Sequence, residues 1–363
     1  MTQSEHRMGG ISINEIFGAI NVSLAFISLG FIQGFGTISL TSIGLNEEQE
    51  SWFVSIDILM VIFFQCIGGK MAEVFGIKKS FMIGSPIIVL GWIFVGTFVS
   101  IPWLLFGRAL SGMGVGVIMV SPTVYIAETA HPDGRATLSS LVGLSFTFGV
   151  CILWILGYFL DWQNLAFVST VPPILTFVGF LFLPESPYWL IQNKRFEEAY
   201  AALKYFRRND EDKKVINEFD EILQHYHQKK VMSHSEKLKS IFSLQFVKPF
   251  SCIGILYTMY EFSGTASTTN YLQSIIIESK IDLESRTCSL ILAFVRLFSS
   301  FMTLVTIQKW QPKFAYNVFA TIRAVSLLLT VIISYHSWCG YVGQRKKTYC
   351  SCLYECQLCI DIV

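Results

Sequence analysis

The sequence predicts an all-α membrane protein that crosses the bilayer about nine times. Of its 363 residues, 52% are hydrophobic and only 15% are charged, whereas an ordinary globular chain carries about 25% charged residues. Long apolar runs alternate with short polar turns, and charges gather most densely between Pro184 and Ser240. The polar start leads directly into an apolar run of membrane-spanning length, so we expect no cleavable signal peptide.

The expected membrane segments are each close to the roughly 20 residues needed to cross the hydrocarbon core. They are residues 16–36, 51–69, 80–100, 102–127, 138–160, 164–183, 248–270, 287–307 and 315–335. The last two are the weakest, because they contain Arg296 and Arg323.

The short connections predict the orientation. Basic residues follow the second, fourth and sixth segments, whereas the first, third and fifth connections are acidic or contain no Lys or Arg. Cytoplasmic loops are enriched in Lys and Arg. We therefore expect a multi-pass membrane protein whose N-terminus is cytoplasmic. The membrane is expected to be the plasma membrane.

The fourth segment begins at Gly107 and carries glycine at alternate positions, namely Gly112, Gly114 and Gly116. Glycine at that density destabilises a helix in water. In lipid, small residues let neighbouring backbones approach closely. We expect the other helices to pack around this one.

The connection over residues 184–246 is the one expected soluble stretch. Its Asp and Glu residues almost balance its Lys and Arg residues, and the whole chain has a formal charge of only +1, so no nucleic-acid partner is expected. Apolar side chains at helical spacing indicate an amphipathic helix beneath the membrane domain. These residues are Phe196, Ala199, Tyr200, Leu203 and Phe206.

The last stretch, residues 336–363, breaks the pattern. Five of the nine cysteines lie there, and three basic residues (Arg345, Lys346 and Lys347) would be outside the cell after nine crossings. Metal binding is conceivable, but the cysteine spacing matches no zinc motif, so we expect neither metal nor cofactor. We interpret the tail as a shifted reading frame or a truncated gene product. The expected divisions are 1–183, 184–246, 247–335 and 336–363.

Three polar turns share one design on the expected cytoplasmic side. They are GGKMAEVFGIKK (Gly68–Lys79), AETAHPDGR (Ala127–Arg135) and PESPYWL (Pro184–Leu190). Glycine permits the tight turn of the first, and proline stops the helix before the third. In this order and spacing they resemble the sugar porter family of the major facilitator superfamily, and in particular its insect trehalose-transporter-like branch.

The resemblance covers about residues 15–335 and implies a fold. Members have twelve helices in two six-helix halves with substrate bound between them, which agrees with the repeat architecture of transporters in general. The major facilitator fold would here comprise a complete N-terminal half and an incomplete C-terminal half.

The resemblance also implies a gating network of cytoplasmic charges that latches the outward-facing state of relatives. Ion pairs that form in one state and break in the other bias a two-state equilibrium. The alternative is that these charges only end helices and fix the topology. The matching residues are Glu73, Arg108, Glu128, Arg135 and Glu185.

The seventh segment matches the sugar-binding pattern of the family only in part. Tyr260 and Glu261 replace two glutamines, Ala266 replaces an asparagine, and Gly143 stands where relatives have a sugar-contacting glutamine. A site without those amides loses hydrogen bonds to sugar hydroxyls. The remaining candidates for substrate binding, which could equally be helix–helix hydrogen-bonding groups, are Ser263, Asn270 and Tyr271.

One carboxylate, Asp57, lies within the second segment. An acid at that depth is by default a functional hypothesis, and the alternative is a polar wall residue near the outer surface. Proton-coupled relatives place an aspartate in the first segment, where this chain has Gln33, Gly34, Phe35 and Gly36. The resemblance therefore implies facilitated diffusion.

We expect transport of a sugar or similar small polar solute, a hexose or disaccharide, by alternating access across the lipid bilayer. The alternative is a truncated, non-transporting membrane protein, either a sensor or partner-binding derivative or a gene fragment. No enzyme is expected, because no catalytic triad, carboxylate pair or nucleotide loop is recognisable.

Overall fold

The computed structural model describes residues 12–208, 212–228, 243–262, 270–271 and 285–309, together with residues 318 and 321. These residues form helices, and no strand occurs among them. The first part of the chain contains α1 (Ile13–Ile43), α2 (Glu47–Phe75), α3 (Ile77–Thr97), α4 (Ile101–Ile118), α5 (Ser121–Thr129), α6 (Pro132–Phe159), α7 (Trp162–Val168) and α8 (Val171–Phe182). It is followed by α9 (Pro187–Gln192), α10 (Phe196–Phe206), α11 (Asp212–Gln228), α13 (Leu244–Glu261) and α16 (Ser285–Lys309).

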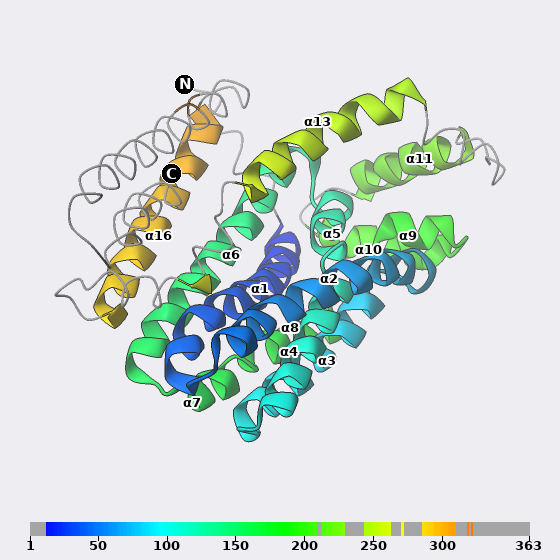
Figure 1. Cartoon of the computed structure of the whole chain (residues 1–363). Helices are drawn as coiled ribbons and strands as arrows, with labels where there is room; N and C mark the ends of the chain where they lie inside the picture. The colour runs from blue at the N-terminus through cyan, green and yellow to red at the C-terminus, as the bar shows by residue number, and fades with distance from the viewer. Residues whose placement is uncertain are drawn as a thin grey trace.

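Six stretches of the described chain are long and apolar enough to cross a membrane. They are Ile13–Leu40, Glu47–Phe75, Ile77–Thr97, Ile101–Thr129, Gly134–Phe159 and Trp162–Phe182. They confirm the first six expected segments. Figure 1 shows the corresponding helices, α1 to α8, as one bundle, with α9, α10 and α11 gathered at one end. We call this end the linker side.

Two of the six spans are broken by proline. The fourth consists of α4 and α5 and breaks just before Pro122, and the sixth consists of α7 and α8 and breaks before Pro172 and Pro173. Proline has no backbone N–H, and its ring clashes with the preceding turn of a helix. Proline favours each break without deciding it alone, because Pro86 lies inside the unbroken α3.

The part of the chain after the linker was expected to contribute three segments. The seventh and eighth correspond to α13 and α16, whose apolar stretches within the described residues are Phe246–Ile255 and Thr287–Met302. Helix α16 packs along α6. The expected ninth segment, apart from residues 318 and 321, and the tail over 336–363 lie outside the described residues.

The alternating glycines of α4 serve two different neighbours. A Cβ atom at Gly112 would collide with the carbonyl oxygen of Asp57 on α2, and one at Gly114 would lie 2.7 Å from that of Gly84 on α3. Real Cβ atoms do not approach so closely, so glycine is required for this packing. Helix α4 is thus held between α2 and α3; the expected close approach is confirmed, but α1 and α6 pack mainly on each other and not around α4.

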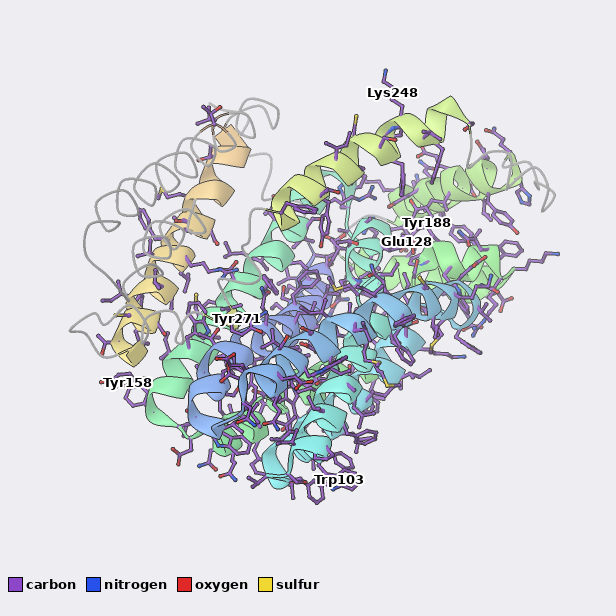
Figure 2. All side chains as sticks on the ribbon, in the orientation of Figure 1. Trp103, Glu128, Tyr158, Tyr188, Lys248 and Tyr271 are labelled. Atoms are coloured by element: carbon purple, nitrogen blue, oxygen red, sulfur yellow. The ribbon has the colours of Figure 1, made fainter. Side chains whose placement is uncertain are left out.

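Aromatic side chains mark the core and the ends of the bundle. Phe35 and Trp92 are fully buried with ring centroids 4.9 Å apart. Figure 2 shows the partly exposed Trp103 and Tyr158 at the end of the bundle opposite the linker side. Aromatic residues at that level suit a membrane–water interface.

The linker helices form a second, smaller core. Ala199 and Leu203 on α10 are buried against Val215 of α11 and Leu190 of α9. Phe206 at the end of α10 instead enters the main core, where its ring lies 6.3 Å from that of Tyr125. The expected amphipathic helix is confirmed, and it is anchored to the membrane bundle.

Candidate functional site

The Glu185 side chain caps α3 on the linker side. Its two carboxylate oxygens accept hydrogen bonds from the backbone N–H of Lys78, at 3.0 and 3.2 Å. The Lys78 ammonium donates in turn to the carbonyl oxygens of Leu183, at 2.7 Å, and Leu181, at 3.2 Å. The first N–H groups of a helix lack intrahelical partners and form the positive end of its dipole, which favours a carboxylate. The end of α8 and the start of α3 are therefore locked together.

Gly76 makes this cap possible. It has a positive φ of 99°, which side chains other than glycine rarely adopt. A Cβ atom there would also collide with Oε2 of Glu185. The glycine of the first polar turn and the glutamate of the third are thus two parts of one contact.

Burial is the main influence on Glu185. Loss of solvent raises the pKa of Glu185 above its ordinary value, and the opposing hydrogen bonds from Lys78 and Ser186 do not cancel that effect. The folded protein therefore favours the protonated carboxyl more than the unfolded chain does.

Glu128 joins the same structure through the neighbouring serine. The Ser186 hydroxyl donates a hydrogen bond to Oε2 of Glu128. The Tyr125 hydroxyl, one turn before Glu128 on α5, donates to the carbonyl oxygen of Pro184 at 2.9 Å. We call Lys78, Glu128, Glu185 and Ser186 the linker-side cluster. It connects α3, α5 and the turn after α8.

Glu73 lies beside this cluster, and Arg135 lies apart from it. The Glu73 side chain forms an exposed ion pair with Lys70 at 2.8 Å, and its carbonyl oxygen accepts a hydrogen bond from Nε1 of Trp189 at 2.9 Å. Arg135 forms no ion pair among the described side chains. Its Nη2 reaches the carbonyl oxygen of Ala130 at 3.5 Å, and its buried Nε has no partner there.

Arg108 does not belong to the linker-side cluster, so its expected place in the cytoplasmic charge network is wrong. Helix α4 begins at Ile101 on the side opposite the linker, and Arg108 lies seven residues further along it. The Arg108 guanidinium forms an ion pair with Asp57 of α2 at 2.9 Å. It also donates to the carbonyl oxygens of Phe53, at 3.3 Å, and Ile32, at 3.1 Å. Both partners of the ion pair are buried, so Arg108 ties α1, α2 and α4 together at a different depth from the linker-side cluster.

The ion pair with Arg108 also explains why a carboxylate, Asp57, can be buried within the second span. One of its oxygens accepts from Arg108, and its Oδ1 has no hydrogen-bond partner among the described residues. A buried carboxylate is stable only when it is paired. Both charges are visible in the sequence, but their spacing does not indicate that they pair.

A second buried charge cluster was not expected. Arg207, just after α10, donates to Glu15 of α1 at 2.5 Å and to Glu218 of α11 at 2.8 Å. Glu15 also accepts from the backbone N–H groups of Ser12 and of His131. One local signal was readable, since Ser12 and Glu15 have the spacing of a capping box. Their remote partner was not.

The structure describes two of the three candidates for substrate binding. Asn270 is 5% exposed and lies against α1, where a Cβ atom at Gly36 would be 3.2 Å from its Oδ1. Tyr271 packs on the edge of the main core. Ser263 lies outside the described residues.

Comparisons with known proteins agree on one family. The family described as "Sugar (and other) transporter" matches residues 37–354. The facilitated trehalose transporter Tret1-2 homolog of Drosophila sechellia is 24% identical over 339 residues, which are 91% of this chain and 68% of that protein. Facilitated trehalose transporter Tret1 is 25% identical in Anopheles gambiae and 26% identical in Polypedilum vanderplanki, and the chain spans 40% and 66% of their lengths.

Solved structures with the same fold include transporters. The partially occluded, inward-open xylose transporter XylE from E. coli superposes with a TM-score of 0.71 at 17% identity, covering 95% of this chain and 84% of that one. The nucleoside transporter NupG gives a TM-score of 0.59 at 12% identity, covering 97% of this chain and 79% of that one. The likeness to XylE and NupG shows the fold, an all-α multi-pass major facilitator fold. Because the family match extends over most of the sequence, the chain belongs to the sugar (and other) transporter family.

Proposed function

We propose that this chain moves a sugar or a similar small polar solute across the membrane by alternating access. The observation that carries the proposal is the family match over residues 37–354, which covers the second to sixth spans, the linker and the helices after it. The relatives that are named facilitated trehalose transporters support a sugar as the solute.

The proposed substrate site lies where the chain after the linker meets the bundle. Asn270 supports this placement, because it is buried and its amide oxygen faces the backbone of α1 at Gly36. An amide can both donate to and accept from a sugar hydroxyl. Tyr271 and Ser263 are the accompanying candidates.

The linker-side cluster is proposed as part of the gate. Its contacts join α3, α5 and the turn after α8, and breaking them would free those helix ends to move. Glu73 and Arg135 are proposed as further members that engage in another state of the transport cycle. Two-state gating requires contacts that differ between the states.

The linker side is proposed to be cytoplasmic, and the membrane to be the plasma membrane. An even number of spans returns the chain to its starting side, and contacts of Glu15 with Arg207 are consistent with this. Lys70, Lys78 and Lys79 lie on that side, in agreement with the enrichment of basic residues in cytoplasmic loops.

Facilitated diffusion is proposed in preference to proton coupling. The first span has no carboxylate after Glu15, and Gln33 to Gly36 stand where proton-coupled relatives were expected to have an aspartate. Asp57 is engaged with Arg108, which supports a structural role for both.

Uptake measurements test these proposals. The chain is expressed in oocytes, surface delivery is quantified, and uptake of radiolabelled glucose, xylose and trehalose is followed. We expect saturable uptake that a protonophore leaves unchanged, and a KM raised about ten-fold by Asn270→Ala, equivalent to about 1.4 kcal/mol of binding. The exposed Asn193→Ala is the matched control. Full surface delivery without saturable uptake of any of these sugars would refute the transport proposal.

A further inference from the structure

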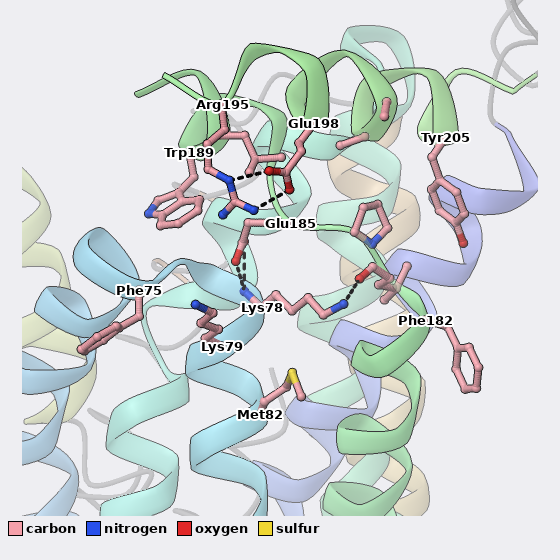
Figure 3. Close-up of a pocket in the computed structure, with 15 residues that line it drawn as sticks. Phe75, Lys78, Lys79, Met82, Phe182, Glu185, Trp189, Arg195, Glu198 and Tyr205 are labelled. Carbon is pink, nitrogen blue, oxygen red and sulfur yellow. Dashed lines mark hydrogen bonds and ion pairs between the residues drawn. The ribbon is translucent and has the colours of Figure 1, made fainter. Parts of the chain in front are cut away.

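A cavity of about 540 Å³ lies at the boundary between the membrane bundle and the linker helices. Figure 3 shows Lys78, Lys79 and Met82 of α3 on one side of it, and Trp189, Arg195 and Glu198 of the linker on the other. It is separate from the proposed substrate site, because Asn270 lies against α1 and no residue of α1 lines the cavity.

The charges in this cavity leave cationic donors available. Both carboxylates are already occupied, Glu185 by backbone N–H groups and Glu198 by Arg195. Lys79 is exposed and has no hydrogen-bonding or ionic partner within the described part of the chain. Arg195 uses its Nε and Nη2 on Glu198, so other guanidinium N–H groups remain free. The cavity therefore fits an anionic group.

The rim of the cavity is apolar on the side that faces the bilayer. Phe75 at the end of α2 is 49% exposed, and Phe182 at the end of α8 is 70% exposed. Both lie at the linker-side ends of membrane spans. Trp189 lines the cavity from the linker side, and its indole suits a membrane interface. A ligand here would meet cations with one end and hydrocarbon with the other.

We propose that this cavity binds the headgroup of an anionic phospholipid from the leaflet on the linker side. The phosphate would lie between Lys79 and Arg195, and the acyl chains would pass Met82 and Phe182 into the bilayer. Basic pockets between helix ends on the cytoplasmic side are suited to anionic headgroups. The proposal does not depend on which solute the protein carries.

The test measures lipid binding on the full chain. The protein is placed in phosphatidylcholine nanodiscs, phosphatidylglycerol is added in steps, and bound lipid is counted by native mass spectrometry. We expect Lys79→Ala to lower the apparent affinity for phosphatidylglycerol about five-fold, the effect of one basic group near a membrane surface. Arg195→Gln should act similarly, which provides a second variant if either one fails to fold.

Two controls establish whether the lipid binds in this cavity. Lys204→Ala removes an exposed cation from α10 that does not line the cavity, and it should leave binding unchanged. Soluble glycerol phosphate should not displace the lipid. Equal binding by wild type and Lys79→Ala, an equal loss in Lys204→Ala, or displacement by glycerol phosphate would each overturn the proposal, the last by assigning the cavity to free phosphates.

Discussion

Glu15 and Arg207 lie 192 positions apart in the chain and form a buried ion pair. The contact fastens the end of α10 to the start of α1. Arg207 also binds the Thr129 carbonyl oxygen at 2.8 Å, so one guanidinium holds the linker against two membrane spans.

Arg207→Ala should therefore destabilise the protein strongly. Removing one partner of a buried ion pair leaves the other charge unpaired, at a cost of about 3 kcal/mol. The melting temperature of the purified chain in detergent measures the loss. Lys204→Ala, which removes an exposed pair with Asp212, is the control and should melt like wild type. Equal melting of the two variants would contradict the role given to Arg207.

Arg108→Lys should not preserve the contact with Asp57. The guanidinium reaches Asp57, Phe53 and Ile32 at once, whereas an ammonium is a compact charge without that geometry. We expect a loss of about 2 kcal/mol, seen as a smaller folded fraction in size-exclusion chromatography after heating. Arg208→Lys on the exposed neighbour of Arg207 should have no effect. Full stability of Arg108→Lys would show that charge alone suffices.

Gly76→Ala and Gly44→Ala form a matched pair. Both glycines have positive φ, 99° and 74°, but a Cβ atom at Gly44 meets nothing within 4 Å, whereas one at Gly76 meets the Glu185 carboxylate. Backbone strain alone costs about 1 kcal/mol at Gly44, and strain with the collision costs about 3 kcal/mol at Gly76. Thermal unfolding compares them. An equal loss would contradict both the collision with Glu185 and the greater backbone strain at Gly76, whose ψ is 161° against 42° at Gly44.

Gly112→Ala tests the close packing of α4 in the same way. The added methyl group would collide with the carbonyl oxygen of Asp57, and overpacking of this kind costs about 1 to 3 kcal/mol. Gly143→Ala on α6 has open space around it and should be neutral. If both variants retain the wild-type melting temperature, the helices are not held as tightly as the contact implies.

Glu185 should make stability depend on pH. Burial raises its pKa in the folded protein above the ordinary value of 4.5, so its contribution is fully present below pH 4.5 and is lost as the pH rises through the raised pKa. Glu185→Gln keeps an acceptor for the Lys78 N–H but cannot ionise. The difference in unfolding free energy between the two proteins should therefore shift in favour of the variant as the pH rises over that window. A constant difference would contradict the pKa shift.

The membrane spans were predictable because crossing lipid requires a long run of apolar residues, and such a run can be recognised from neighbouring residues in the sequence alone. The breaks before Pro122 and Pro172 were not predicted, and proline alone does not decide them, because Pro86 lies inside the unbroken α3. The linker-side cluster could be predicted in part, because the polar turns containing Glu128 and Glu185 were expected on the same side of the membrane. Their connection through Ser186 depends on side-chain geometry that spacing does not reveal.

Arg108 shows where motif reasoning failed. The resemblance matched Arg108 to a charged residue of the family but did not show how deep in the membrane it lies. Counting residues from the turn before Ile101 would have placed Arg108 away from the linker side. The pairing of Glu15 with Arg207 was beyond local reasoning, because no period or motif connects positions 192 residues apart.

The anchoring of α1 to α10 also has a consequence for biosynthesis. Ser12 donates to the Phe206 carbonyl oxygen at 2.5 Å, and Asn14 donates to that of Tyr205 at 2.6 Å. A ribosome that adds about 5 to 20 residues per second reaches Arg207 roughly 10 to 40 s after Glu15. All six spans are translated before the polar groups at the start of the first one obtain their partners. The linker thus closes the N-terminal bundle only after its last helix has been made.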